Sequence, residues 1–503
     1  MRTFLVGVLV VFIITLFYGY SFCDEFYLES SEVSHYEYVV VYASNTNFVD
    51  DFYISVLRDG GIVPDLLGRE RVYGKVVGGR VEFVYIPVYG IKDGFYDVVV
   101  MSNGVEVFRS NFLVISRQQM KLREPLRVLT FEENVPVWKI MGDSRIGYKK
   151  VADFLYRVMV DANLNTFVML GGQTTYLKDK KNIWYSVPLS NLVVLKYLKE
   201  RGIQTGAYVM CFLTLGGSEK VFHRGYYPNL VYRKGRLTKE YKYVSIISQR
   251  RVSDIVDILT YIGRLEYVDF LGLDFIRVGD FGGYELFRDF YYEIYSRIVD
   301  NDLPYIQAPN GEKSLINFAS RVMDNQKLRK LFRWYQSVRV SRVIKFIRDE
   351  VRSRGVNKPI IAFMLGWNAG REHGQDLFMF RDAGVDYSFY MLYEFYSDEM
   401  FEEAGRFYLT KVYNLDTQIV FGNIIDSYLN RGKSSPLDNF SGRLRKIVME
   451  YSYFPPNGFF FHDVYRLFRG RIRPYSSFEW IDKIKETSKF LEDSYFRREM
   501  NSY

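Results

Sequence analysis

Hydrophobic and polar positions divide the chain into two parts with different patterns. From about residue 25 to residue 116, short runs rich in Val, Tyr and Phe are separated by turn signals such as Asp59-Gly60-Gly61 and Asn103-Gly104. Short strand-like runs at this spacing predict an all-β sandwich of the immunoglobulin or fibronectin type. Nothing in this part resembles a catalytic motif, and we interpret it as a spacer or a carbohydrate-binding module.

The remainder of the chain alternates helical periodicities with short apolar runs. We predict strands at residues 166–170, 205–212, 244–247, 268–275, 359–365, 387–393, 418–425 and 458–461. Helices that alternate with buried strands are typical of a parallel α/β architecture. Because the pattern contains eight such strands, it predicts a (β/α)8 TIM barrel preceded by the small all-β sandwich.

These patterns give four segments. Arg2 precedes an apolar run at residues 4–18, and small residues stand at Ser21 and Cys23, so residues 1–23 match a secretory signal peptide. The sandwich takes residues 24–117, a linker residues 118–136 and the barrel residues 137–503. The signal predicts a secreted, periplasmic or cell-envelope protein. The alternatives are an uncleaved segment that anchors the chain in a membrane and a lipid anchor at Cys23. Because the two folded parts carry separate hydrophobic patterns, removing residues up to Arg117 is expected to leave a folded barrel.

The composition and charge of the chain limit the classes of function that we consider. The chain has 503 residues, of which 48% are hydrophobic, and this supports a large folded core. Its net charge is +8, but 59 acidic residues are interspersed with the basic ones. This distribution argues against a nucleic-acid-binding patch and favours a mildly basic surface that attracts anionic polymers. The sequence does not indicate an oligomeric state.

Metal and cofactor motifs are missing from the sequence. The four His and two Cys residues are widely separated, so the spacing of a zinc site does not occur. Neither a P-loop nor the nucleophile motif of serine hydrolases is present. We therefore expect no metal and no cofactor.

Polar side chains follow several of the predicted barrel strands. In a TIM barrel the carboxyl ends of the strands meet at the active-site mouth. Acidic residues rarely end apolar strands without a function, because burying an unpaired charge is costly. The residues at these strand ends are Asp274, Arg277, Trp367, Asn368, Tyr393, Glu394, Asp426, His462 and Asp463.

The segment 267–277, Y-V-D-F-L-G-L-D-F-I-R, resembles the fourth barrel strand of the glycoside-hydrolase-like families related to family 10. Their signature is of the type D-G-I-x-x-D-Y-I-R. Asp269, Asp274, Ile276 and Arg277 match it, whereas Phe270 replaces the glycine. The M-x-Y motif of strand six in these families is also kept, at Met391 and Tyr393. The resemblance covers the chain from about Arg127 to its C-terminus.

This resemblance implies a secreted glycoside hydrolase that cleaves the O-glycosidic bonds of a poly- or oligosaccharide by a retaining mechanism with two carboxyl groups. Asp274 is then the nucleophile or charge-stabilising group, and its alternative role is an ion pair with Arg277. Glu394 takes the general acid/base role, in the position of a strand-six carboxylate in α-galactosidase-like barrels, and its alternative is a solvated loop carboxylate. Asp463 and Asp426 are further candidates for the acid.

The other strand-end residues are expected to bind substrate. Trp367 and Tyr393 present aromatic faces that can stack on sugar rings or cap the barrel core. Asn368 belongs to a polar loop of the kind that carries specificity. Arg277, Asp426 and His462 complete the predicted binding set, and Asp463 can form an ion pair beside His462 that orders the site.

Two alternatives bear on this interpretation. A chitinase-like strand four would carry acids where Gly272 and Ile276 stand, which argues against that mechanism. A non-catalytic carbohydrate-binding or cell-envelope protein on a barrel scaffold is the rival class, since a fold does not establish an activity. Two carboxylates in one mouth favour the enzyme, whereas Asp274 locked on Arg277 without a partner acid favours the binding protein.

Overall fold

The computed structural model describes residues 26–44, 52–120, 124–133, 135–143, 145–172, 187–214, 218–219, 222, 225–280, 282–365, 367–394, 397–402, 405, 417–451 and 456–501. The predicted signal peptide at residues 1–23 lies outside this range. Within it, no helix combines the length and the apolar character needed to cross a membrane. The chain forms two compact units, one of Met1–Ser116, Lys234–Arg236 and Tyr284–Val338 and one of Arg117–Arg233, Leu237–Gly283 and Arg339–Tyr503.

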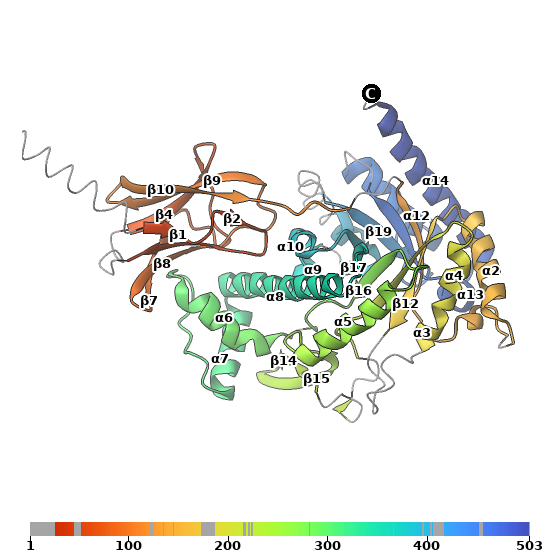
Figure 1. Ribbon diagram of the computed structural model, residues 1–503, viewed down its shortest axis with the longest axis horizontal. Coiled ribbons are helices and arrows are strands. Elements are labelled where there is room, and N and C mark those ends of the chain that lie inside the picture. Colours follow the sequence, from red (N-terminus) through yellow and green to blue (C-terminus); the bar gives the residue numbers. More distant parts are fainter. Residues whose placement is uncertain are drawn as a thin grey trace, which may run out of the picture. The chain divides into compact units, whose positions relative to one another are not determined.

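The first unit contains the expected all-β sandwich, drawn in red and orange in Figure 1. One sheet has the strand order β1-β3-β8-β7, and the other has the order β2-β10-β9-β4-β5 with β6 paired to β4. The strands are β1 (Phe26–Leu28), β2 (Glu32–Val33), β3 (Val39–Ala43), β4 (Phe52–Arg58), β5 (Gly61–Ile62), β6 (Val72–Tyr73), β7 (Lys75–Val77), β8 (Arg80–Tyr85), β9 (Gly94–Ser102) and β10 (Val105–Val114).

Both sheets bury side chains in one common core. Phe26 and Phe83 come from the first sheet, and Ile54, Val98 and Phe112 come from the second. This shared core confirms an all-β domain before the barrel. The immunoglobulin-like assignment of its topology stays a prediction.

The first unit also contains a helical segment that the sequence pattern placed in the barrel domain. Residues 284–338 form η5 (Tyr284–Leu286), α6 (Phe287–Glu293), η6 (Tyr295–Arg297), α7 (Glu312–Asp324) and the first part of α8 (Gln326–Ser353). Their aromatic rings pack on one another, with ring centroids 4.0 Å apart for Phe287 and Phe318 and 5.9 Å apart for Tyr284 and Phe332.

Polar contacts join this helical segment to the sandwich within the first unit. The Arg297 guanidinium lies 2.6 Å from a carboxylate oxygen of Glu82 and donates to the Tyr38 hydroxyl at 2.9 Å. Arg69, which is ion-paired with Asp65, donates to the carbonyl of Val299 at 2.9 Å. The Glu82 side chain is only 4% exposed, and its charge is compensated by Arg297 and by Arg80, which lies 3.3 Å from its other carboxylate oxygen.

The second unit is a closed barrel of parallel strands, as predicted. The order is β11-β12-β13-β16-β17-β18-β19-β20, and each strand pairs in parallel with the next. The strands are β11 (Leu126–Phe131), β12 (Thr166–Gly172), β13 (Gln204–Met210), β16 (Phe270–Asp274), β17 (Ile360–Leu365), β18 (Tyr387–Met391), β19 (Ile419–Ile424) and β20 (Gly458–His462).

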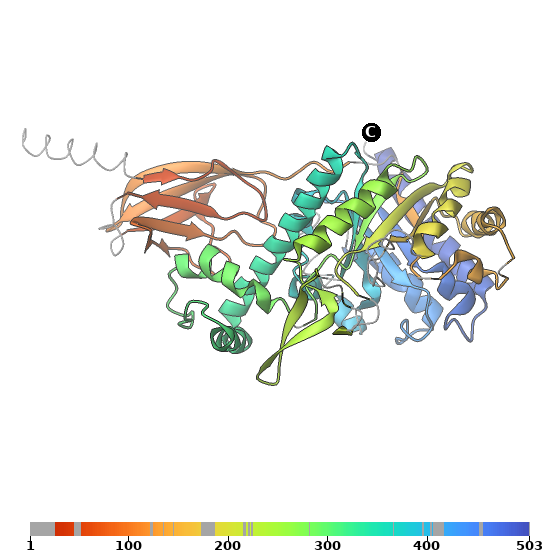
Figure 2. The same ribbon diagram turned by 60° about the horizontal axis from the view of Figure 1, so that its bottom comes forward.

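Helices and short turns alternate with these strands, as Figure 1 shows for the yellow to blue part of the chain. They are η2 (Val137–Ile140), α2 (Tyr148–Asp161), α3 (Val187–Asn191), α4 (Val193–Lys199), α5 (Gln249–Gly263), the rest of α8, α9 (Trp367–Glu372), α10 (Leu377–Ala383), η7 (Leu392–Glu394), α12 (Pro436–Lys446), η9 (Ile447–Tyr451), α13 (Val464–Arg469) and α14 (Ser477–Asn501). A hairpin of β14 (Pro228–Arg233) and β15 (Arg236–Val244) is inserted between β13 and α5 and extends away from the barrel strands in Figure 2.

Two strand assignments from the sequence are wrong. The first barrel strand is β11, which lies inside the stretch 118–136 that we expected to be a linker. Its six residues are all buried, but the run directly follows Pro125 at the boundary between the two sequence patterns, where a linker was expected. The strand predicted at residues 244–247 does not exist, because Val244 ends the β15 hairpin and the next residues lead into α5.

Removing residues 1–116 should leave a chain that aggregates or melts at a temperature lower by roughly 5 °C or more. The reason is that residues 284–338 would lose the Glu82 carboxylate that compensates Arg297 and the Arg69 guanidinium that donates to the Val299 carbonyl. Size-exclusion chromatography and a melting curve of the truncated chain test this expectation. A monomer with the melting temperature of the full chain would show that the helical segment holds its fold alone.

A point variant tests the contribution of the Glu82–Arg297 ion pair without removing the sandwich. Glu82→Gln in the full chain should lower the free energy of unfolding by about 1–3 kcal/mol, because it leaves the guanidinium of Arg297 without its carboxylate. Glu106→Gln is the matched control, since its ion pair with Arg109 is exposed and should contribute less than about 0.5 kcal/mol.

Candidate active site

The interior of the barrel is filled by side chains from alternate positions of its strands. This cluster includes Leu126 and Val128 of β11, Phe270 of β16, Phe389 of β18 and Phe460 of β20. Because side chains alternate along a strand, every second residue faces the barrel interior. Counting on from the residues of the cluster gives the inward-facing positions at the carboxyl ends of the strands. These positions are occupied by polar side chains, namely Glu132, Asp274, Tyr393 and His462.

Glu132 and His462 form a close ion pair at the ends of the adjacent strands β11 and β20. His462 Nε2 lies 2.6 Å from Glu132 Oε2, and its Nδ1 lies 2.9 Å from the hydroxyl of Thr130. Burial acts to lower the pKa of His462, but the Glu132 carboxylate outweighs it and raises that pKa above the ordinary value. Burial acts to raise the pKa of Glu132, but His462 outweighs it and lowers that pKa. Glu132 is therefore held ionised.

Glu132 is not among the site residues predicted from the sequence. It follows the apolar run R-V-L-T-F, in the same relation that Asp274 has to its own strand. The signal was present, but the run was assigned to a linker, so the carboxylate at its end was not considered.

Asp274 ends β16, which is separated from β20 by three strands on either side of the closed barrel. Its side chain is buried, and one carboxyl oxygen accepts the backbone N–H of Phe275 at 2.7 Å. Burial, followed by the negative charge of Glu132, raises the pKa of Asp274 to about 7, against the lowering effects of Arg277 and His462. Asp274 thus retains a proton at pH values where an exposed aspartate has lost it.

Space for these groups depends on Gly272, the preceding inward residue of β16. A Cβ at Gly272 would overlap the side chain of Tyr208, which fills the barrel interior beneath the site. The Tyr208 phenol is fully buried, and burial together with the charges of Glu132, Asp274 and Asp463 raises its pKa well above the ordinary value. A neutral aromatic ring therefore forms the floor below the carboxyl groups.

Arg277 stands beside Asp274 but forms no ion pair with it in the described part of the chain. Its guanidinium carbon lies 4.4 Å from the centroid of the Phe275 ring, which packs on the barrel-interior cluster. Phe275 has φ of +49°, a left-handed conformation that is unfavourable for an aromatic residue. Two backbone bonds hold this turn, because the Phe275 carbonyl accepts the N–H groups of Phe212 at 3.2 Å and Arg277 at 3.0 Å.

Asp463 is buried behind the ion pair instead of facing the mouth with its oxygens free. One oxygen accepts the backbone N–H of Arg466 at 2.8 Å and so caps α13, and the other accepts the N–H of Glu132 at 3.1 Å. Burial raises the pKa of Asp463. The second of these contacts holds the backbone of Glu132 against Asp463.

Asp426, after β19, is also completely buried in contacts within the protein. It lies 2.8 Å from Arg471 and 3.5 Å from Arg466, and it accepts the backbone N–H groups of Tyr428 and Leu429. These contacts already satisfy the Asp426 carboxylate. A substrate would have to displace them in order to bind it.

The remaining predicted residues differ in how far the structure describes them. The Tyr393 ring stacks on His462, with centroids 5.6 Å apart and an interplanar angle of 12°. Glu394 lies in η7 after β18, and Trp367 and Asn368 begin α9 after β17, so their backbones are at the carboxyl ends of strands. The side chains of these three residues lie outside what the structure describes, and their roles stay predictions.

Glu132, His462 and Asp463 are the kind of group that can hold a metal ion, since their ligand atoms lie within 4.8 Å of one another. Most of their ligand atoms, however, already have partners within the protein. Glu132 Oε2 contacts His462, and both oxygens of Asp463 accept backbone N–H groups. The donor set fits an ion-pair network, and a metal would have to replace the Glu132–His462 contact.

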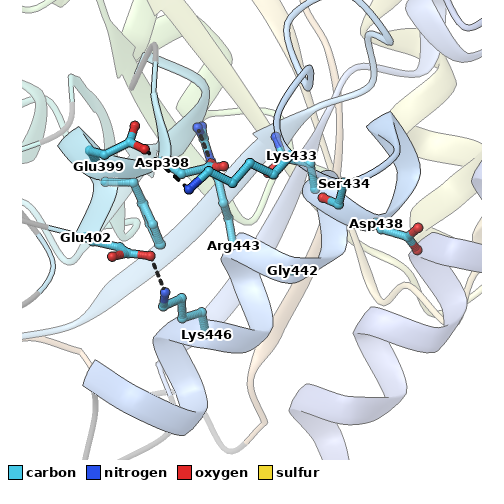
Figure 3. Close-up of a pocket in the computed structure, with 11 residues that line it drawn as sticks. Asp398, Glu399, Glu402, Lys433, Ser434, Asp438, Gly442, Arg443 and Lys446 are labelled. Carbon is cyan, nitrogen blue, oxygen red and sulfur yellow. Dashed lines mark hydrogen bonds and ion pairs between the residues drawn. The ribbon is translucent and has the colours of Figure 1, made fainter.

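A second concave region lies between the helical turn after β18 and α12. It has a volume of about 350 Å³, and its lining includes Asp398, Glu399, Glu402, Lys433 and Arg443. Figure 3 shows that opposite charges face each other across it, with ion pairs of 3.3 Å for Arg443 and Asp398 and 3.7 Å for Lys433 and Glu399. The charges of this region compensate one another. At the barrel mouth, by contrast, the charge of Glu132 acts against ionisation of Asp274.

No family model matches the sequence, and no curated protein matches it. Among solved structures, the chain is similar to the glycoside hydrolase domain of PgaB (BpsB) from Bordetella bronchiseptica, with a TM-score of 0.46 and 10% identity over 68% of this chain and 95% of that one. It is also similar to a β-galactosidase from Rahnella sp. R3, with a TM-score of 0.47 and 11% identity over 75% of this chain and 57% of that one.

A third similar structure is the GH36 α-galactosidase AgaA from Geobacillus stearothermophilus, with a TM-score of 0.39 and 11% identity over 90% of this chain and 55% of that one. The chain therefore spans little more than half the length of the two galactosidases. The proteins found are glycoside hydrolases, but at these scores and identities the fold assignment stands on the strand pairing of this chain itself.

The raised pKa of Asp274 predicts a pH-dependent gain in stability for Asp274→Asn. Between about pH 4 and pH 7 the folded protein keeps a proton that the unfolded chain has released, so the wild-type free energy of unfolding falls as the pH rises. Asparagine does not titrate, and its oxygen can still accept the Phe275 N–H. The variant should therefore melt above the wild type by a margin that grows up to pH 7, with an upper bound of about 4 kcal/mol.

Melting curves from pH 4 to pH 8.5 measure this margin. Asp161→Asn, an exposed position on α2, is the matched control and should not change the pH dependence. A margin for Asp274→Asn that is constant with pH, or that shrinks as the pH rises, would contradict the raised pKa.

Proposed function

We propose that the protein hydrolyses O-glycosidic bonds of a poly- or oligosaccharide, with Asp274 as the general acid and Glu132 as the ionised carboxylate. The main support for this proposal is that the surroundings at the barrel mouth shift the pKa values of the two carboxyl groups in opposite directions. The pKa of Asp274 is raised to about 7, and the pKa of Glu132 is lowered by His462. One protonated and one ionised carboxyl group are what glycosidic cleavage requires.

The proposed reaction has two steps. Asp274 donates its proton to the glycosidic oxygen while the Glu132 carboxylate attacks the anomeric carbon, so that the leaving group departs as an alcohol and a glycosyl ester forms. The Asp274 carboxylate then takes a proton from water, and the water oxygen attacks the anomeric carbon and releases Glu132. This is the retaining course, and the anomeric configuration of the first product, observed by NMR, tests it.

His462 and Asp463 act on Glu132 in this proposal. The imidazolium keeps the carboxylate ionised in a poorly solvated place, and Asp463 fixes the backbone of Glu132 by accepting its N–H group. Tyr393, stacked on His462, presents an aromatic ring beside the pair, where it can contact a sugar face. Trp367 and Asn368 are proposed to bind the substrate from the loop after β17.

The rival function is a non-catalytic protein that binds carbohydrate at the same mouth. It would be favoured by an Asp274 side chain locked on Arg277 with no second acid nearby. Asp274 has no ion pair with Arg277 among the described residues, and the Glu132 charge acts on it directly. We therefore favour the enzyme. The matching signal peptide at residues 1–23 supports secretion or a place in the cell envelope.

The pH dependence of hydrolysis follows from the two pKa shifts. The first step needs protonated Asp274 and ionised Glu132. The rate constant kcat/KM should therefore fall as the pH rises through about 7, by about tenfold per pH unit, as the acid loses its proton. It should also fall when the pH drops below the ordinary range of a glutamate, because the lowered pKa of Glu132 sets the acidic limit. A rate that stays level between pH 6 and pH 9 would contradict Asp274 as the acid.

Variants of Asp274 and Glu394 separate the two candidates for the acid. Asp274→Asn should slow natural glycans by about 10²–10⁴-fold, because their leaving groups need a proton, and should slow an aryl glycoside with a good leaving group far less. Glu394→Gln should slow both substrates by similar, smaller factors. The reverse ranking would give the acid role to Glu394 and return Asp274 to the role of nucleophile.

Azide distinguishes the roles further with the same aryl glycoside. In Asp274→Ala, azide should attack the glycosyl ester in place of deprotonated water and give a glycosyl azide of retained configuration. In Glu132→Ala, azide should attack the substrate directly and give the inverted configuration. Circular dichroism of both variants checks that they are folded.

A further inference from the structure

The side chain of Arg277 is buried at the barrel mouth without a hydrogen-bond partner in the described part of the chain. The residue is 7% exposed, and its Nε and Nη1 atoms are buried with no acceptor. A buried donor without an acceptor destabilises the folded chain, and a charged donor does so more strongly. The charge of Arg277 acts to lower the pKa values of both Asp274 and Glu132. Neither carboxyl group, however, accepts a hydrogen bond from Nε or Nη1, so these unmet donors need an explanation.

Other buried arginines of the same unit satisfy at least part of their guanidinium group. Arg381 pairs with Asp382 at 2.9 Å, and Arg443 pairs with Asp398 at 3.3 Å. Arg251 donates to the carbonyls of Met210 and Cys211. Arg277 differs from them because it is held only by packing, with its guanidinium stacked on the Phe275 ring.

The position of this guanidinium is fixed by the turn that carries it. The N–H of Arg277 donates to the Phe275 carbonyl at 3.0 Å, and the N–H of Val278 donates to the His373 carbonyl at 2.9 Å. Stacking on an aromatic ring leaves the edge of a guanidinium, where its N–H groups lie, available to an acceptor. The arrangement therefore presents donors that are oriented before any ligand arrives.

The charges around Arg277 also bear on what it can bind. The His373 imidazole faces it, and burial followed by the charge of Arg277 lowers the pKa of His373. His373 Nδ1 lies 3.1 Å from the Val278 carbonyl and 3.7 Å from Asp280, which is 41% exposed. On the barrel side stand Asp274, which keeps a proton up to a pH of about 7, and the ionised Glu132, whose charge His462 compensates. Arg277 is thus left as the uncompensated cation of the mouth among the described residues.

We infer that Arg277 receives the anionic substituent of an acidic glycan, a sugar carboxylate or a sulfate ester, next to the bond that is cleaved. This inference rests on the proposed function for the word glycan, but the anion site stands on the geometry of Arg277 alone. A planar guanidinium with oriented donors is suited to the oxygens of both anions. The net charge of +8 would favour the approach of such a polyanion.

Binding measurements with the full chain test this inference apart from hydrolysis. The probes are an oligogalacturonide with its carboxyl-reduced counterpart, and a sulfated galactan oligosaccharide with its desulfated counterpart, each titrated by calorimetry. The protein should bind one acidic probe about tenfold or more tightly than its neutral partner. The pair that shows the preference identifies the anion as a carboxylate or a sulfate.

Substitution then assigns the preference to Arg277. Arg277→Gln should abolish the difference between the acidic and the neutral probe while changing the affinity for the neutral probe less than about threefold, and Arg277→Lys should keep part of the difference. Arg471→Gln is the matched control, because this arginine of the same barrel already pairs with Asp426, and it should keep the full preference.

Three outcomes would overturn the inference. They are equal binding of acidic and neutral probes by the wild type, no binding of either acidic probe, and an equal loss for both members of a pair in Arg277→Gln. The last outcome would mean that Arg277 only tunes the carboxyl groups. If the acidic preference is present but no glycan is hydrolysed, the proposed function fails and the anion site stands.

Discussion

Desolvation of carboxyl groups above an apolar barrel core is the constraint on which this site depends. The inward layer formed by Tyr208, Phe389 and Phe460 excludes water from below, so a charge placed above it must find a partner or keep its proton. Glu132 finds a partner in His462 at 2.6 Å. Asp274 has no comparable partner among the described residues and keeps its proton up to a pH of about 7. One physical cause thus produces two carboxyl groups in different states.

The same constraint explains the arrangement around the pair. Asp463 and Asp426 are also buried, but each is satisfied within the protein, Asp463 by two backbone N–H groups and Asp426 by backbone N–H groups and arginines. They stabilise the loops after β20 and β19 instead of facing a substrate. Arg277 is the exception, since its buried donors have no acceptor among the described residues. This guanidinium with unmet donors is the feature from which we infer an anionic ligand.

The helical segment 284–338 shows that the chain is not a simple sequence of a sandwich followed by a barrel. It lies between β16 and β17 in the sequence, yet it forms one compact unit with the sandwich. Its own aromatic cluster and the buried Glu82–Arg297 pair give it a core that excludes water. The two units are therefore joined by the covalent chain in more than one place, and changes in the sandwich are expected to affect this insertion.

The sequence by itself determined the fold class and part of the site. Alternating apolar strands and helices predicted the barrel, and the carboxylate at the end of a buried run identified Asp274, because these signals are local. The strand at residues 126–131 follows Pro125 in a stretch that was expected to be a linker, and so Glu132 was missed although the same rule applies to it. Only the tertiary structure decided which groups share the mouth, because strand closure brings Glu132 and His462 together across 330 positions of the chain, as the contact between Thr130 and His462, 332 residues apart, illustrates. Protonation states and unmet donors depend on such long-range contacts and on burial, and neither is encoded in a local pattern.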